Sequence, residues 1–151
     1  MLFKKPQKLN IYVDMDGVLA NFAEQEDAVE RFAREKGFFQ KLRPFEKNVN
    51  AVRFLNQLKN VNIFILSASP NRKADYDKKV WLSKYLPELE QEQIIIMRNG
   101  KKKVNYMKTA EGILLDDYGR NLQEWTEGNL LNQAFKIKVD GDIEKIFTMR
   151  F

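Results

Sequence analysis

The chain alternates short apolar runs with segments of helical periodicity, and this alternation restricts its fold more than any other feature. The apolar runs are rich in Ile, Val and Phe and cover residues 9–13, 61–66, 93–97, 112–115 and 135–139. Between them, apolar residues recur every three or four positions, as at Val49, Val52, Leu55 and Leu58. Strands that alternate with helices predict an α/β fold, with a parallel sheet of about five strands covered by helices on both faces.

One connection is longer than a turn between a strand and a helix requires. It covers residues 21–47 and contains a second amphipathic piece at Ala28, Val29, Phe32 and Ala33. An insertion beside the carboxyl end of a strand often acts as a lid over a site. We therefore predict one domain over residues 1–151, with a small helical cap inserted after the first strand at about residues 21–47.

The 151 residues include neither His nor Cys. Their absence excludes a disulfide framework, a thiolate nucleophile, a Cys/His zinc site and a Ser-His-Asp triad. The chain has 26 Lys and Arg against 21 Asp and Glu, and the net charge of +5 favours an anionic partner. Catalysis would therefore depend on carboxylates, hydroxyls, lysines or a metal held by oxygen. No apolar run is long enough to cross a bilayer, so we expect a cytoplasmic protein with no membrane partner.

Two pairs of carboxylates follow two of the predicted strands. Asp14 and Asp16 end the first strand, where Gly17 allows a tight turn, and Asp116 and Asp117 follow the fourth apolar run. The carboxyl ends of parallel strands meet at one edge of a sheet, so the four side chains should converge there. Their mutual repulsion calls for a cation, and oxygen ligands suit Mg²⁺. The simpler interpretation of each pair is a polar turn after a strand.

A third strand ends in Ser67, Ala68, Ser69 and Pro70, where the first three residues offer backbone amides and the serines offer hydroxyls. Such a segment before a helix can hold a phosphate oxygen, although Ser and Pro are also ordinary residues at a helix start. A transferring phosphoryl group also needs positive charge. The candidate sources are Lys101, Lys102, Lys103, Lys78 and Lys79. A solvated surface is the simpler interpretation of any one of these lysines.

In this order, a strand ending in DxDGV, a strand ending in Ser, a Lys and a strand ending in DD resemble the four motifs of the haloacid dehalogenase-like (HAD) hydrolase superfamily. Three segments are also similar to the 5′-nucleotidase family that includes the deoxyribonucleotidases: DMDGVLANF (14–22), KKVWLSKYLP (78–87) and ILLDDYGRNLQEW (113–125). The resemblance extends from residue 10 to about residue 125. It implies a Rossmannoid sheet and a Mg²⁺-dependent phosphoric monoester hydrolase.

The resemblance also implies a role for each motif. Asp14 would be the nucleophile that forms an aspartyl-phosphate, and Asp16 would be the general acid and then the general base. Mg²⁺ would be held by both acidic pairs, with Asp16 contributing its backbone carbonyl and Asp117 orienting bound water. The phosphate-binding residues would be Ser67, Ala68 and Lys103, and the spacing leaves Lys101, Lys102 and Lys78 as competitors for the place of Lys103.

Cap aromatics sandwich the base in the nucleotidases, and the matching positions are Phe22, Phe38 and Phe39. The resemblance therefore implies a (deoxy)nucleoside monophosphate as substrate, whereas the simpler interpretation of the rings is packing within the cap. The chain departs from the family at Asn21, where Asp is usual, and in its shorter cap. Both departures concern the choice of nucleoside and not the phosphatase chemistry.

Two other functions are compatible with these residues. The same hydrolysis can act on a sugar phosphate or another small phosphometabolite. A non-catalytic module associated with nucleic acid is less compatible, because the lysines do not form a basic stripe interleaved with aromatic residues. We therefore predict a hydrolase of small phosphate esters and do not expect nucleic acid as a partner.

Overall fold

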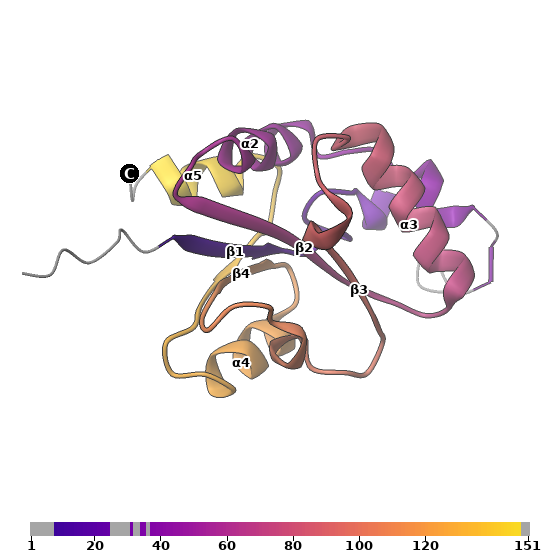
Figure 1. Ribbon diagram of the computed structural model, residues 1–151. Coiled ribbons are helices and arrows are strands. Elements are labelled where there is room, and N and C mark those ends of the chain that lie inside the picture. Colours follow the sequence, from indigo (N-terminus) through magenta and orange to yellow (C-terminus); the bar gives the residue numbers. More distant parts are fainter. Residues whose placement is uncertain (1–7, 25–30, 32–33, 36, 149–151) are drawn as a thin grey trace, which may run out of the picture.

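A five-stranded parallel sheet lies at the centre of the computed structural model, which describes residues 8–24, 31, 34–35 and 37–148. The strands follow the spatial order β3-β2-β1-β4-β5, so β1 is central and lies between β2 and β4 (Figure 1). Their bounds are Leu9–Val13 for β1, Val61–Ser69 for β2, Ile94–Arg98 for β3, Ile113–Asp116 for β4 and Gln133–Lys136 for β5. The predicted fold class is confirmed.

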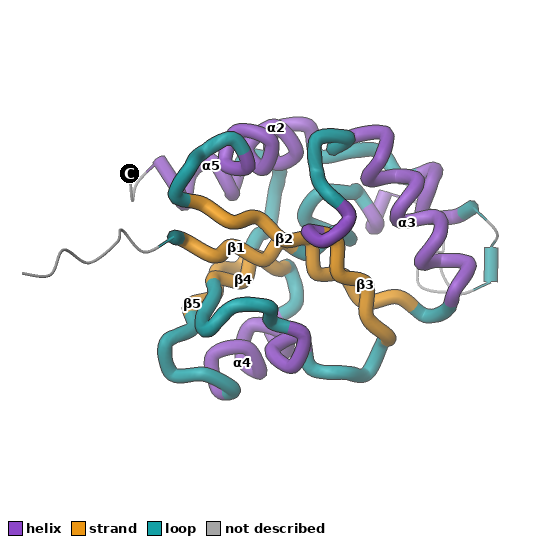
Figure 2. Tube along the Cα trace, viewed as in Figure 1, coloured by secondary structure: helices purple, strands orange, loops and turns teal. Residues whose placement is uncertain are grey.

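Helices cover both faces of the sheet (Figures 1 and 2). One face carries α2 (Glu46–Asn56), α3 (Arg72–Tyr85) and α5 (Asp142–Thr148), and the other carries α4 (Gly119–Glu127). In the described parts of the connections lie four short 3-10 helices: η1 (Phe22–Glu24), η2 (Phe38–Lys41), η3 (Gln91–Gln93) and η4 (Lys103–Tyr106). None of the helices in the described ranges is long and apolar enough to cross a membrane.

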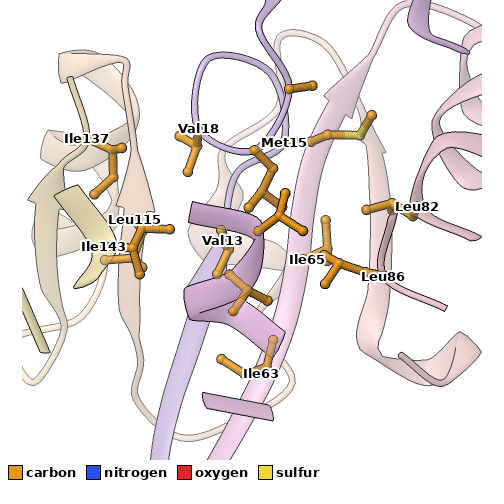
Figure 3. Close-up of a cluster of buried hydrophobic side chains, with 14 of the residues drawn as sticks. Val13, Met15, Val18, Ile63, Ile65, Leu82, Leu86, Leu115, Ile137 and Ile143 are labelled. Atoms are coloured by element: carbon orange, nitrogen blue, oxygen red, sulfur yellow. The ribbon is translucent and has the colours of Figure 1, made fainter. Parts of the chain in front are cut away.

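Alternate residues of the central strands enter two separate hydrophobic clusters. Val13, Ile65 and Leu115 face α2, α3 and α5, where they pack with residues such as Leu82 and Ile143 (Figure 3). Their neighbours in sequence point the other way: Tyr12, Leu66 and Leu114 pack with Trp125 of α4. Burial on both faces explains why these strands are continuous apolar runs and not an alternation of apolar and polar residues.

The predicted strand at residues 135–139 is placed wrongly, because β5 covers Gln133–Lys136. The N–H of Ile137 still donates to Asp116 O of β4, but those of Lys138 and Val139 donate to Asp142 Oδ2. The bonds to Asp142 replace bonds to β4, so the strand ends and α5 starts. The amphipathic piece predicted at Ala28, Val29, Phe32 and Ala33 lies outside the described residues.

Candidate active site

The two acidic pairs meet at the carboxyl edge of the sheet, because β1 and β4 are adjacent and parallel. Val13 is in register with Leu115, and the N–H of Asp14 donates to Leu115 O at 2.9 Å. Asp14 and Asp116 therefore leave the sheet side by side. Asp116 is fully buried and Asp14 is 7% exposed, so both carboxylates depend on protein groups for compensation.

The turn after β1 wraps around one carbonyl group. The N–H groups of Leu19 and Ala20 both donate to Met15 O, at 2.8 and 2.9 Å. Gly17 lies in this turn with φ of +82°, in the left-handed region, and a Cβ at this position would overlap the Asp117 carboxylate. The glycine in the DMDGV segment therefore allows both the turn and the close approach of the second acidic pair.

Lys103 connects the two strand ends from the start of η4. Its Nζ donates to Asp14 Oδ1 at 2.9 Å and to Asp116 Oδ2 at 2.7 Å, and the residue is 3% exposed. Burial alone would lower the pKa of Lys103, but the charges of Asp14 and Asp116 outweigh burial and raise it. Lys103 is therefore a fixed positive charge between the two carboxylates.

Three carboxylates are close enough to share a cation. Asp14, Asp116 and Asp117 each offer one oxygen, and these oxygens lie within 4.8 Å of one another. Burial, followed by the charge of Asp116, raises the pKa of Asp14 well above its usual value, and the same two causes raise the pKa of Asp117 to about 6. The ionised forms are thus costly without a further positive charge.

The donor chemistry of this cluster fits a magnesium ion. All the side-chain donors are carboxylate oxygens, which a hard divalent cation prefers. Four carboxylates, with Asp16 included, face the two lysines Lys78 and Lys103, so the fully ionised site lacks the charge of one divalent cation. The predicted metal ligands are therefore brought together, although Asp16 does not belong to the cluster of three side chains.

Lys78 holds Asp16 from the buried face of α3. Its Nζ donates to Asp16 Oδ2 at 2.7 Å, to Ser67 Oγ at 2.8 Å and to Ala68 O at 2.6 Å. It also lies 4.4 Å from the centre of the Phe39 ring, within the range of a cation–π contact. The other oxygen of Asp16, Oδ1, is buried and has no hydrogen-bond partner within the described part of the chain.

The predicted phosphate-binding residues Ser67 and Ala68 lie at different depths below the surface. Ala68 lines the cavity at the site, whereas Ser67 is 1% exposed and its hydroxyl accepts from Lys78 beneath the surface. Among the competing lysines, Lys101 and Lys102 are exposed and Lys78 is fully buried. Lys103 is the lysine that lines the cavity.

A cavity of about 320 Å³ opens over the carboxylates. Phe22 and Phe39 line it, with their ring centres 6.3 Å apart and the rings inclined by 25°. Phe38 and Phe39 are both buried in the core cluster, at 0% and 1% exposure, and meet edge to face at 5.2 Å. Phe39 also forms part of the cavity wall, whereas Phe38 does not line the cavity. Of the three predicted cap rings, the half-buried Phe22 is the most open to the site.

Sequence reasoning missed several residues at this cavity. Asn121, in the first turns of α4, donates from Nδ2 to Asp116 Oδ2 at 3.1 Å. The sequence did offer one indication of Asn121: an amide side chain five positions after Asp116, the last residue of β4. Other lining residues that were not predicted are Ala23, Asn99 and Tyr118.

A larger cavity of about 630 Å³ lies elsewhere, between α2 and α5. Its lining is mainly apolar and includes Phe54, Leu58 and Phe147. Size alone would favour it as a ligand site, but the cluster of carboxylates and lysines lies at the smaller cavity. We therefore assign the chemistry to the smaller one.

Comparison with known proteins agrees with this geometry. Residues 22–142 match the model of the family described as 5′ nucleotidase, deoxy (pyrimidine), cytosolic type C protein. A protein of Vibrio phage KVP40 that bears the name "Putative 5′(3′)-deoxyribonucleotidase" is 28% identical, in an alignment that covers 78% of this chain and 71% of that protein.

Solved structures share the fold at low sequence identity. The HAD domain of the effector Lem4 of Legionella pneumophila is 16% identical with a TM-score of 0.58, over 95% of this chain and 92% of that one. The Legionella pneumophila effector Ceg4 is 15% identical with a TM-score of 0.55, over 99% and 97%. Together with the family match, these similarities confirm a HAD-like fold. The chain belongs to the cytosolic type C 5′-nucleotidase family and is a phosphoric monoester hydrolase.

Proposed function

We propose that this protein is a Mg²⁺-dependent nucleotidase that releases phosphate from (deoxy)nucleoside monophosphates through an aspartyl-phosphate on Asp14. The observation that carries the proposal is the position of Lys103, which bridges Asp14 and Asp116 at the floor of a cavity walled by aromatic rings. This arrangement combines a carboxylate nucleophile, a cation for the phosphoryl oxygens and a surface for a base.

In the first half of the reaction, a carboxylate oxygen of Asp14 forms a bond to phosphorus while the bond from phosphorus to the ester oxygen breaks. Asp16 donates its proton to that leaving oxygen, which departs as the nucleoside hydroxyl. Asp16 lines the cavity, and its Oδ1 has no hydrogen-bond partner among the described residues, so none of these residues competes for a proton on that oxygen. Lys78 holds the other oxygen and so fixes the direction of the carboxyl group.

In the second half, water attacks the phosphorus of the aspartyl-phosphate. Asp16, now ionised, takes one proton from the water as its oxygen bonds to phosphorus. The bond between phosphorus and Asp14 breaks, which regenerates the carboxylate and releases inorganic phosphate. One carboxyl group thus moves the proton in both directions, in a chain that has no His.

Counting hydrogen-bond donors separates the roles of the two buried lysines. An ammonium group has three N–H donors. Lys78 directs all three at Asp16, Ser67 and Ala68, whereas Lys103 directs two at Asp14 and Asp116. Among the described residues, the third donor of Lys103 has no partner, so it is left for a phosphate oxygen, and Lys103 lines the cavity. The count favours Lys103 as the phosphate-binding lysine and Lys78 as the residue that positions Asp16.

Asp14, Asp116 and Asp117 would hold Mg²⁺ through their carboxylates, with the backbone carbonyl of Asp16 as a further ligand. When bound, the ion supplies positive charge that stabilises the phosphoryl oxygens. Asn121 and the N–H of Tyr118 both donate to the Asp116 carboxylate, at 3.1 and 3.0 Å, and so orient it toward the cluster.

The walls of the cavity support a nucleotide as substrate. The half-buried Phe22 lies at the cavity with the buried Phe39 ring beside it in the wall, and stacking on an aromatic ring tolerates different bases. The family match and the name of the phage relative point the same way. The products would be a nucleoside and inorganic phosphate.

A phosphate-release screen tests this function. Purified protein is incubated with nucleoside monophosphates and with sugar phosphates, with Mg²⁺ or with EDTA. We expect release from nucleotides that requires Mg²⁺ and is lost in Asp14→Asn but kept in the surface variant Glu88→Gln. Preference for sugar phosphates would overturn the substrate assignment, and release that persists in Asp14→Asn would overturn the mechanism.

A further inference from the structure

Asp77 is a buried carboxylate that the reaction does not use. It lies on α3 immediately before Lys78 and is 5% exposed. Its Oδ2 accepts from the N–H of Gly37 at 2.9 Å, and its Oδ1 accepts from Gln40 Nε2 at 2.6 Å. A buried charge is costly unless it is bonded in this way. Both bonds go to the segment around η2, far from α3 in the sequence.

The same side of α3 also holds the other end of this segment. Trp81, one helical turn after Asp77, donates from Nε1 to Leu42 O at 2.8 Å. Gly37, which precedes η2, adopts φ of +77° and has no side chain with which to cap the short helix, so the Asp77 carboxylate binds its N–H instead. Residues 37–42 are therefore attached to α3 at both ends.

This segment places the ring of Phe39 at the active site. The Phe39 ring is 1% exposed, lines the cavity wall and lies beside the half-buried Phe22 ring, with 6.3 Å between the ring centres. Lys78 lies against the Phe39 ring while it binds Asp16. Asp77 and Lys78 are adjacent on α3. One turn of this helix therefore fixes both the segment that carries Phe39, through Asp77, and the proposed acid Asp16, through Lys78. A shift of the segment 37–42 would move Phe39 without moving Asp14 or Lys103, which come from other elements.

We infer that Asp77 is a positioning residue for substrate binding: it fixes the segment 37–42 and thereby sets the distance between the Phe39 ring and the phosphate site. This inference rests on the proposed nucleotidase function. Asp77 should therefore affect how tightly the base binds against the aromatic wall. It should not affect the rate at which the phosphoryl group is transferred.

The kinetic test compares a deoxynucleoside monophosphate with ribose 5-phosphate, which has no base to stack. In Asp77→Ala we expect the KM for the nucleotide to rise about tenfold, the cost of one lost charge-assisted hydrogen bond, with kcat changed less than about twofold. The kcat/KM for ribose 5-phosphate should stay within about twofold of wild type. Asp77→Asn keeps an acceptor for Gly37 and should restore most of the nucleotide affinity.

Two further variants control for folding. Asp75→Ala removes another paired carboxylate of α3, one that binds Arg98 of β3 and not the segment 37–42, and should leave both substrates unaffected. Gln40→Ala removes one of the two bonds to Asp77 and should raise the nucleotide KM by an intermediate factor. Parallel losses with both substrates in Asp77→Ala, or no change with either, would overturn the inference.

Amide hydrogen exchange gives a measurement that does not depend on activity. The amide of Gly37 should lose protection in Asp77→Ala and keep it in Asp77→Asn and Asp75→Ala. If wild type hydrolyses neither substrate, the proposed function fails, and this exchange experiment alone decides the role of Asp77. Unchanged protection of Gly37 in Asp77→Ala would then show that Asp77 does not fix the segment.

Discussion

Lys103 Nζ donates to Asp14 Oδ1 at 2.9 Å, although 89 positions separate the two residues in the sequence. The bond joins the end of the central strand to η4, which precedes β4. Lys103 is nearly inaccessible to solvent, so its charge is compensated by Asp14 and Asp116 and not by water. The electrostatics of the site therefore depend on this one side chain more than on the surface lysines.

Replacing Lys103 should abolish most of the activity. Removal of a donor that stabilises a developing oxyanion typically lowers kcat by about 10²–10³-fold, and we expect a loss of this size in Lys103→Met. Lys101→Met removes an exposed lysine of the same loop and should keep kcat within about twofold. Steady-state kinetics on the best nucleotide measures both. Activity in Lys103→Met within a few-fold of wild type would contradict the role of this lysine.

Magnesium should stabilise the protein more at pH 8 than at pH 5. Without metal, the pKa of Asp14 is raised in the folded protein and that of Asp117 is about 6. The folded state therefore binds protons more tightly than the unfolded chain does. The free energy of unfolding of the metal-free protein should therefore fall as the pH rises through about 6. Mg²⁺ binds the ionised carboxylates and offsets this loss.

Thermal unfolding with Mg²⁺ or EDTA measures this pH dependence. At about one hundred times its Kd, a ligand adds about 2.7 kcal/mol, which corresponds to a rise in Tm of about 5–10 °C for a chain of this size. We expect such a rise at pH 8 and less than half of it at pH 5. Equal stabilisation at both pH values would contradict a metal site made of these carboxylates.

Substituting Gly17 should damage the metal site and the turn together. Any side chain at this position would overlap Asp117, and an L-residue with φ near +82° is strained. We expect Gly17→Ala to lose about 1–3 kcal/mol of stability and most of its affinity for Mg²⁺. Gly100→Ala is the matched control, because Gly100 also has a positive φ but open space around it. Calorimetric titration with Mg²⁺ should separate the two variants.

Asn48 is the polar residue whose loss should most affect folding. It is fully buried, donates to Val18 O at 2.8 Å and accepts from the N–H groups of Gly141 and Ile143 at 2.9 and 3.3 Å. Asn48→Ala leaves these groups without a partner, and we expect a loss of about 2–4 kcal/mol. Asn50→Ala, on the exposed side of the same helix, should lose less than about 0.5 kcal/mol in urea unfolding.

The parts of the fold that depend on local patterns were predictable from the sequence. Strands buried on both faces are continuous apolar runs, so β1 was found at its bounds and β2 at its first residue. The apolar run ends at Leu66, whereas β2 continues to Ser69, because Ser67, Ala68 and Ser69 still pair with β3. The convergence of Asp14 and Asp116 followed from the parallel order of strands alone. The alternation of strands and helices predicted a helix between the second and third apolar runs, where α3 lies, but the buried face of α3 includes Asp77 and Lys78, which a hydrophobic pattern does not indicate.

Other features depend on tertiary contacts that have no periodic signature. The end of β5 is set by the Asp142 carboxylate, which binds the N–H groups of two residues that an apolar count assigns to the strand. The different positions of Phe38 and Phe39 follow from the packing of η2 against α3 and could not be read from two adjacent Phe residues. The choice of Lys103 over Lys101 and Lys102 required knowing which of them is buried.

The position of β1 between β2 and β4 has a consequence for synthesis of the chain. β1 is made before β4, and a nascent chain that stops before residue 113 carries Asp14 and Asp16 without Lys103 bridged to Asp116. Pairing of β1 with β4 closes a long loop, a step that is slow in folding. Chains that stop before β4 should therefore lack hydrolase activity, and this enzyme would become an active catalyst only after β4 has been translated and has paired with β1.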